Sequence, residues 1–291
     1  MKSVLPILTV VAAIVVLWYA AAIGMNSKWA SEQAARQGVE LSFSELVADT
    51  WSQDRPRLPV PHQVLAELWN TTGAKVLAGK TWSKRSLIFH GWITLSATLA
   101  GFAIGTTAGI LLAVGIVHNK AMDMSVMPWA IASQTIPILA IAPMIIVVLN
   151  SIGIQGLIPK AIISAYLSFF PVVVGMVKGL RSPGAEQLDL LSTYHASGSQ
   201  TFWKLRLPAS MPYLFTSLKI AMAASLVGAI VGELPTGAIR GLGARMLTGS
   251  YYGQTIQIWS ALFAAAILAA ALVGIIGIAE KIMLKRMGAA R

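Results

Sequence analysis

The sequence contains no cysteine in its 291 residues. Disulfide frameworks, cysteine-ligated zinc, iron–sulfur clusters and thiol nucleophiles are therefore excluded. Only four histidines are present, scattered along the chain, so a metal enzyme is not expected. The motifs G-x-S-x-G and H-E-x-x-H are also missing, and no apolar run carries a pair of carboxylates. Hydrolytic chemistry within a membrane thus has no candidate catalyst.

Charge is scarce as well. Charged residues make up 11% of the chain, against about 25% in soluble domains, while 56% of residues are hydrophobic and the mean hydropathy is +0.71. Much of the surface must therefore lie in a solvent other than water. The net charge is +11. In a soluble protein such an excess would suggest nucleic acid, but in a chain this apolar the location of the basic residues matters first.

Six apolar runs are close to the roughly 20 residues that a helix needs to cross the hydrocarbon core. They cover residues 4–24, 92–117, 124–149, 161–177, 213–234 and part of 246–279. Because lipid forces backbone polar groups to be satisfied within their own segment, each run is expected to be helical. The sequence predicts an all-α integral membrane protein with six transmembrane helices. The expected parts are an N-terminal helix (1–25), a polar segment (26–88), a five-helix core (89–286) and a tail (287–291).

The basic residues predict the orientation, because short cytoplasmic segments are enriched in Lys and Arg. With the N-terminus inside, the short segments outside hold only Lys160, Arg240 and Arg245, and Lys219 can reach back to the interface from the fifth run. The cytoplasmic set is then Lys2, Lys120, Lys178, Arg181, Lys204, Arg206, Lys219, Lys281, Lys285, Arg286 and Arg291. Both termini are expected in the cytoplasm. Lys80, Lys84 and Arg85 lie outside near the second run and oppose this pattern.

Two further features concern the length of the first run and the polar segment that follows it. Its length exceeds the 7 to 15 residues of a signal-peptide core, so an uncleaved helix is expected. The polar segment after it contains Val64-Leu65-Ala66-Glu67-Leu68-Trp69, whose apolar spacing predicts a helix. This helix either lies along the membrane face or is an ordinary loop helix.

Glycine and proline mark the core. Gly101, Gly105 and Gly109 recur every four residues, as do Gly228 and Gly232, and such rows let helix backbones approach closely. Packing within one chain is favoured over a sliding subunit interface. Pro137 and Pro143 in the third run and Pro171 in the fourth are expected to interrupt helices and free carbonyls. The residues predicted to line a translocation path are Gln134, Thr135, Pro137, Pro143, Ser164 and Glu233.

Glu233 stands at the outer end of the fifth run and has two interpretations. A carboxylate at membrane depth is a functional candidate, for example as a gate. Alternatively, if the run ends one turn earlier, Glu233 is an interfacial residue that pairs with Arg240 or Arg245. The interfacial interpretation is preferred.

The segment 180–212 is the most polar cytoplasmic piece. It mixes apolar and polar residues without a run long enough to enter lipid, which indicates a pair of short helices on the cytoplasmic face. The apolar residues expected to be exposed there are Leu188, Leu191, Phe202 and Leu205. Such a surface invites a partner.

This segment resembles the cytoplasmic signature of the membrane subunits of ABC importers, E-A-A-x-x-x-G followed by nine residues and I-x-L-P. Leu207-Pro208 matches its end, which places Leu205 at the Ile position, His195 at the Gly position and Asp189-Leu190-Leu191 at E-A-A. Ala196-Ser197 and the stretch 202–212 look like the branch that imports nitrate, sulfonates, taurine and pyrimidine precursors. Both Ala positions are Leu here. His replaces a Gly that suits a turn with φ > 0, and Gly198 could take over that turn.

The resemblance implies a function and partners. The chain would be the permease subunit of an importer in the bacterial inner membrane. The partners that the resemblance implies are a dimer of ATPase subunits, a periplasmic solute-binding protein and a second permease copy. The segment around Asp189, Leu190, Leu191, His195, Ala196, Ser197, Gly198, Leu205, Leu207 and Pro208 would couple it to the ATPase. ATP would bind to that partner, so this chain would need no cofactor and would not be an enzyme.

Two other functions compete with this one. An ion-coupled secondary transporter would need inverted repeats and intramembrane ionisable groups, and only Lys219 and Glu233, both near the ends of a run, are available. A non-transporting scaffold leaves the cytoplasmic helices unexplained. For the substrate, the resemblance implies a small polar solute, with a pyrimidine-type vitamin precursor first and a sulfonate, taurine or nitrate-like solute next.

Overall fold

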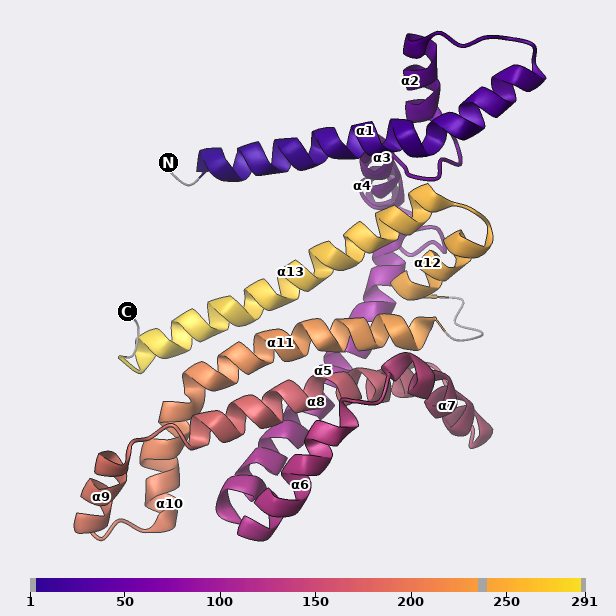
Figure 1. Cartoon of the computed structure of the whole chain (residues 1–291). Coiled ribbons are helices and arrows are strands. Elements are labelled where there is room, and N and C mark those ends of the chain that lie inside the picture. The colour runs from indigo at the N-terminus through magenta and orange to yellow at the C-terminus, as the bar shows by residue number, and fades with distance from the viewer. Residues whose placement is uncertain (1–3, 235–239, 289–291) are drawn as a thin grey trace. The chain divides into compact units, whose positions relative to one another are not determined.

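The computed structural model describes residues 4–234 and 240–288, which form α-helices and one short π-helix with no strand among them (Figure 1). The elements are α1 (Val4–Arg36), α2 (Phe43–Ser52), α3 (Pro61–Thr71), α4 (Gly73–Leu77), α5 (Leu87–His118), α6 (Lys120–Ser133), α7 (Ile138–Ser151), α8 (Leu157–Leu180), α9 (Ala185–Thr193), α10 (Gly198–Thr201), the π-helix η1 (Phe202–Arg206), α11 (Leu207–Glu233), α12 (Leu242–Tyr251) and α13 (Thr255–Arg286). They form two compact units. Unit 1 comprises Met1–Gly91 with Ala244–Ala265, and unit 2 comprises Trp92–Gly243 with Ala266–Arg291.

The all-α membrane architecture is confirmed. Five helical segments in the described residues are long and apolar enough to cross a membrane, and α6 with α7 gives a sixth if the bent pair is one span. That pair is bent by 97°. The bend falls at Pro137, the residue that precedes α7, because proline disfavours helix at the residue before it. The predicted interruption at this proline is therefore correct.

The other predicted interruptions are wrong. Pro143 lies inside α7 and Pro171 inside α8, and both helices continue through them. A proline removes one hydrogen-bond donor, but the remaining bonds of a helix in an apolar medium have no water to replace them, so the helix is retained.

In unit 1, α1 continues past the end of the first apolar run to Arg36. The buried side chain of Asn26 fixes it to the polar segment: its Nδ2 donates to the carbonyls of Thr50 (3.1 Å) and Leu58 (2.9 Å), and its Oδ1 accepts from the Leu58 N–H (3.1 Å). Further along α1, the ring of Trp18 contacts those of Trp259 and Phe263. Residues before position 92 and residues 244–265, which are far apart in the sequence, thus form one unit. The sequence did not indicate this association.

The helix predicted at residues 64–69 is present as α3. Pro61 starts it, and Val64 is buried whereas Leu65 and Trp69 are exposed. The α3 helix is followed directly by the short α4, so the polar segment is largely helical.

In unit 2, α8 and α11 form the most extensive helix pair among the described residues. A Cβ added to Gly228 on α11 would lie 2.6 Å from the Cα of Ser164 on α8. On α5, a Cβ at Gly101 would lie 2.7 Å from the carbonyl oxygen of Ala161, and one at Gly109 would lie 2.8 Å from the Cβ of Val172. Both glycine rows therefore serve packing within the chain, as predicted.

The second half of α13 also belongs to unit 2. Leu272 and Ile276 pack with Phe215 and Met222 of α11. Lys219 forms an ion pair with Glu280 of α13 and so has a charged partner rather than reaching the interface alone.

We expect Gly228→Ala to destabilise the protein, because no space exists for the methyl group beside the α8 backbone; overpacking typically costs about 1–3 kcal/mol. Gly274→Ala is the matched control, since a Cβ there meets nothing within 4 Å and alanine favours the helix. The midpoint of thermal unfolding in detergent, monitored by size-exclusion chromatography, should be lower than that of the wild type for Gly228→Ala. For Gly274→Ala it should be equal to that of the wild type or higher. Equal midpoints would contradict the packing role of Gly228.

Candidate functional site

The segment between α8 and α11 contains two short helices, α9 and α10, as the sequence predicts. Figure 1 shows them at the end of unit 2 opposite to the C-terminus of α11. At the start of α9 the side chain of Gln187 accepts a hydrogen bond from the Gly184 N–H (3.3 Å). Asp189 lies in this helix, and its side chain is exposed. Its backbone carbonyl accepts a hydrogen bond from Thr193 Oγ1 (3.0 Å).

The turn after α9 explains the histidine at the family's glycine position. His195 has φ 52°, and among the described residues it is the only non-glycine with positive φ. Its N–H donates to the Ser192 carbonyl (2.9 Å), and the Ala196 N–H donates to the Leu191 carbonyl (3.0 Å). These two bonds define a Schellman motif, whose left-handed position usually holds glycine. The turn is thus kept at His195, and the alternative that Gly198 takes it over is wrong, because Gly198 begins α10.

The chain then leads from α10 into α11 through a continuous helical segment. Ser197 starts α10: its Oγ accepts from the Gln200 N–H (3.3 Å), and the Gln200 side chain accepts from the Ser197 N–H (2.8 Å). Residues 202–206 form the π-helix η1, in which the Leu207 N–H donates to the Phe202 carbonyl. Pro208 follows at once and has no N–H to donate to the Lys204 carbonyl, so the wider π turn accommodates its ring.

The exposed apolar residues of this segment differ from those predicted. Leu188, Leu191, Phe202 and Leu205 are half-buried. Phe202 packs against the core cluster of Ile116 and Met176 because η1 joins α11 without a loop. The residues that face outward are Leu190 (58% exposed), Tyr194 (76%) and Trp203 (63%).

The predicted path residues separate into two groups. Gln134, Thr135, Pro137 and Pro143 are exposed at or near the bend between α6 and α7. Ser164 is fully buried, and its Oγ lies 2.7 Å from the Ser225 Oγ and donates to the Ser225 carbonyl. In this conformation Ser164 therefore serves the contact between α8 and α11.

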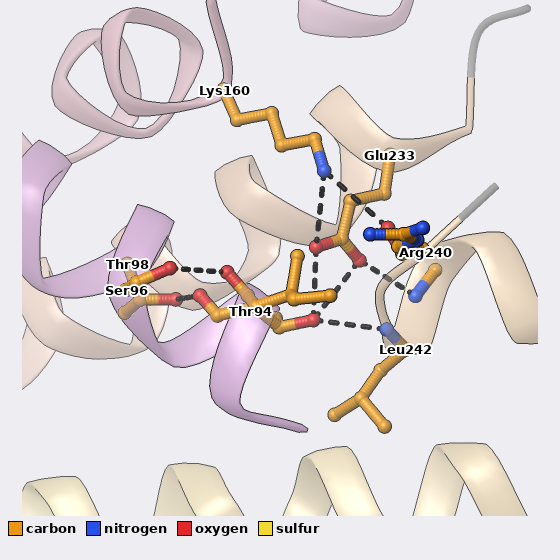
Figure 2. A network of polar contacts seen from close by, with 9 residues as sticks. Thr94, Ser96, Thr98, Lys160, Glu233, Arg240 and Leu242 are labelled. Carbon is orange, nitrogen blue, oxygen red and sulfur yellow. Dashed lines mark hydrogen bonds and ion pairs between the residues drawn. The ribbon is translucent and has the colours of Figure 1, made fainter. Parts of the chain in front are cut away.

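Glu233 is the centre of a buried polar network (Figure 2). Its carboxylate is 0% exposed and accepts hydrogen bonds from Thr94 Oγ1 (2.9 and 3.0 Å to its two oxygens) and from the Gly243 N–H (2.9 Å). Lys160 Nζ lies 3.8 Å from Glu233 Oε1 and 3.4 Å from the Arg240 carbonyl, to which it donates. The Thr94 hydroxyl also accepts from the Leu242 N–H (2.9 Å).

The carboxylate of Glu233 is buried within the protein and forms an ion pair with Lys160 of α8, a partner that neither sequence interpretation named. The glycines at 241 and 243 allow the chain to wrap around it. Gly241 has φ +125°, and a Cβ on Gly243 would lie 2.5 Å from the Ile230 carbonyl oxygen. A buried charge needs both a partner of opposite charge and hydrogen bonds. Lys160 is the charged partner, and the Gly243 N–H supplies one of the hydrogen bonds.

A line of hydroxyl groups continues from Thr94 into the helix contacts. Thr98 Oγ1 donates to the Thr94 carbonyl (2.8 Å), and Ser225 Oγ donates to the Thr98 carbonyl (2.8 Å). Ser225 in turn meets Ser164. The hydroxyls thus connect the Glu233 network with the α8–α11 contact through hydrogen bonds that need no water.

Sequence reasoning missed Thr94 and Lys160. In the sequence Lys160 serves only as an orientation signal, although a lysine directly before an apolar run could have suggested a partner for Glu233. Thr94 gives no such signal, because a threonine in a membrane helix usually bonds to its own backbone.

We expect His195→Gly to stabilise the turn by about 1 kcal/mol, because glycine adopts positive φ without steric cost. His195→Val should weaken it, since a branched side chain fits the left-handed region poorly. Hydrogen exchange at the amides of His195 (or its replacement) and Ala196 reports on the two bonds of the turn. Protection should increase in the first variant and decrease in the second, and the reverse order would contradict the assignment.

We expect Glu233→Gln to destabilise the protein by about 3 to 5 kcal/mol, because it leaves Lys160 without its carboxylate. In addition, an amide NH2 in place of Oε2 would face the Gly243 N–H. Combining Glu233→Gln with Lys160→Met should recover part of the loss. Thermal unfolding in detergent measures both variants, and a single variant as stable as the wild type would contradict the buried ion pair.

Comparison with known proteins bears on what these features do. Residues 105–288 match the family described as the inner membrane component of binding-protein-dependent transport systems. The formylaminopyrimidine transport permease protein ThiX of Halalkalibacterium halodurans is 35% identical over 167 residues, which cover 56% of this chain and 65% of that protein.

Two further relatives extend the similarity. The riboflavin transport system permease protein RibX of Chloroflexus aurantiacus is 28% identical over 78% of this chain and 80% of its own length. The putative aliphatic sulfonates transport permease protein SsuC of Bacillus subtilis is 22% identical over 68% of this chain and 70% of its own length. These relatives favour a permease over an ion-coupled transporter. Because the matched region includes both α9 with its turn and the Glu233 loop, the chain belongs to the family of binding-protein-dependent transport system inner membrane components.

Proposed function

We propose that the chain is the permease subunit of an ATP-driven ABC importer and forms half of a path for a small polar solute. The observation that carries this proposal is the exposed α9 turn. His195 adopts there the positive φ of the signature glycine, and Leu190 and Tyr194 present apolar surface to a partner. Exposed apolar side chains on a short polar helix are typical of a protein-binding surface.

The partner proposed for this surface is an ATPase subunit. It would bind ATP, so the chain itself would need no cofactor and would catalyse no reaction. Movement of a docked α9 would act on both α8 and α11, because the segment joins these two helices directly. A rigid element of this kind is what coupling between an ATPase and a path requires.

The remaining assembly follows from the same proposal. A second copy of the chain would complete the path, and a periplasmic binding protein would deliver the solute on the outer face. The chain would lie in the bacterial inner membrane with both termini in the cytoplasm. The α9 segment would then be cytoplasmic, together with the basic residues Lys120, Lys178, Arg181, Lys204 and Arg206 of unit 2.

For the path itself we propose the exposed residues at the bend between α6 and α7. Gln134 and Thr135 occupy the break before Pro137, and Pro143 follows in α7. Non-helical backbone at membrane depth is tolerated where it lines a cavity or is covered by protein, which supports this location. Glu233 and Ser164 would support the path from behind, through their buried hydrogen bonds.

The solute is proposed to be a pyrimidine-type vitamin precursor, with a sulfonate, taurine or nitrate-like solute as the next candidate. Support comes from the names of the relatives: ThiX is a formylaminopyrimidine permease, and SsuC is a putative aliphatic sulfonate permease.

The docking role is tested with the variant Leu190→Ser/Trp203→Ser. The amount of ATPase that co-purifies with it from mild detergent should be at least tenfold lower than with the wild type, because the variant removes two of the three exposed apolar side chains of the segment. Gln155→Ser is the control, since Gln155 is exposed at the opposite end of α8. The solutes are compared in the reconstituted complex with the binding protein present. The rate of ATP hydrolysis is measured with formylaminopyrimidine and with an alkanesulfonate, and the solute that is transported should raise the rate more.

Two outcomes would contradict the proposal at different points. Full ATPase retention by the double variant would overturn the docking assignment alone. A wild-type chain that never retains an ATPase would overturn the importer function.

A further inference from the structure

Unit 1 contains a group of basic residues that the transport function does not use. This basic cluster consists of Lys75 on α4, Lys80, Lys84 and Arg85 in the turns before α5, and Arg245 on α12. Between Glu67 and Asp123 the sequence contains no acidic residue. The cluster therefore has little opposite charge nearby in the chain.

Local structure holds the first two lysines together. The α4 helix ends in a Schellman motif: Gly79 has φ +67°, its N–H donates to the Val76 carbonyl (3.0 Å), and the Lys80 N–H donates to the Lys75 carbonyl (2.8 Å). This motif brings the residues at the positions of Lys75 and Lys80 next to each other. Two like charges in this arrangement repel unless an anion lies between them.

The next two basic residues are fixed by tight turns. The Ser83 N–H donates to the Lys80 carbonyl (3.0 Å), and the Ser86 N–H donates to the Ser83 carbonyl (2.9 Å). The Lys84 carbonyl is within hydrogen-bond distance of His90 Nε2 (2.9 Å). Lys80, Lys84 and Arg85 are exposed, so a well-defined backbone presents three charges to the surroundings.

Arg245 adds a charge from a distant part of the sequence. Burial lowers the pKa of its guanidinium; nearby Glu67 opposes this shift, and Arg85 adds to it. The pKa of Glu67 is raised by burial and lowered by Arg245 and Lys75. One carboxylate thus faces several cations. Among the residues that the structure describes, none is a hydrogen-bond partner of the buried Nε of Arg245, which leaves a donor for an added acceptor.

Apolar side chains surround these charges. Val76, Leu77 and Trp82 are exposed, Leu77 by 80% and Trp82 by 63%. The apolar span of α5 starts at Leu87, two residues after Arg85. Basic and aromatic residues beside a span are typical of the membrane–water interface, where they contact lipid headgroups. A soluble anion would give no reason for the exposed apolar groups.

We propose that the basic cluster binds the phosphate of an anionic phospholipid headgroup. Lys80, Lys84 and Arg85 contact the phosphate, while Leu77 and Trp82 lie against the upper acyl region. In the proposed orientation the cluster is on the outer face, where the preference of basic residues for cytoplasmic segments does not explain it. The inference does not depend on ATP hydrolysis or on the identity of the solute.

The test uses the full-length protein in detergent, titrated with mixed micelles of phosphatidylglycerol or phosphatidylcholine and with inorganic phosphate. Wild type should bind phosphatidylglycerol and be thermally stabilised by it, and phosphatidylcholine and inorganic phosphate should have little effect. In Lys80→Gln/Lys84→Gln/Arg85→Gln the apparent affinity for phosphatidylglycerol should fall by about fivefold for each charge removed. The matched control is Lys28→Gln/Arg36→Gln/Arg55→Gln, which removes three exposed charges elsewhere in unit 1 and should retain binding.

A charge-preserving variant, Lys80→Arg/Lys84→Arg, guards against misfolding as the cause and should bind like the wild type. Unchanged affinity in the glutamine variant would overturn the proposal. Equal losses in the control would also overturn it, because the effect would then reflect net charge alone. Stabilisation by inorganic phosphate as strong as that by phosphatidylglycerol would identify a soluble anion as the ligand instead of a lipid.

Discussion

The close approach of α5, α8 and α11 is the constraint on which the rest of unit 2 depends. Between helices in lipid the hydrophobic effect gives little attraction, so packing at short distance has to supply it. Gly101 and Gly228 provide that distance on two sides of Ser164. Polar groups buried by this close packing need hydrogen-bond partners. The Ser164 and Ser225 hydroxyls are hydrogen-bonded to each other, and each also donates to a backbone carbonyl.

This packing makes α8 and α11 a single element with a distinct feature at each end. At one end the α9–α10 segment joins the two helices in sequence. At the other end Lys160 of α8 pairs with Glu233 of α11. A displacement of α9 therefore acts on both helices, and the ion pair resists their separation at the far end. Thr94 and the Gly243 N–H bind the same carboxylate, so the part of α5 that belongs to unit 2 is attached to this end as well.

The sequence was sufficient for features that follow from local rules. Apolar length gave the spans, the glycine spacing gave the contacts of Gly101 and Gly228, and Pro137 gave the bend, because each depends on a few neighbouring residues. It was not sufficient for Pro143 and Pro171, where the cost of breaking a helix in an apolar medium exceeds the cost of one missing donor. Nor could it place Glu233, whose burial depends on Lys160 and Thr94, 73 and 139 residues away in the chain.

Backbone conformations that disfavour ordinary side chains occur at both ends of the α8–α11 element. Gly241 has positive φ where the chain wraps around Glu233, and any side chain there would occupy the position of the carboxylate. His195 has positive φ at the other end, where glycine would cost less. The two bonds of the Schellman motif hold the turn in spite of that cost, so the side chain is not needed for the fold of the turn. The exposed imidazole of His195 is therefore available to contact a partner. Gly241 differs in this respect, because its lack of a side chain is what allows the chain to close around the buried carboxylate.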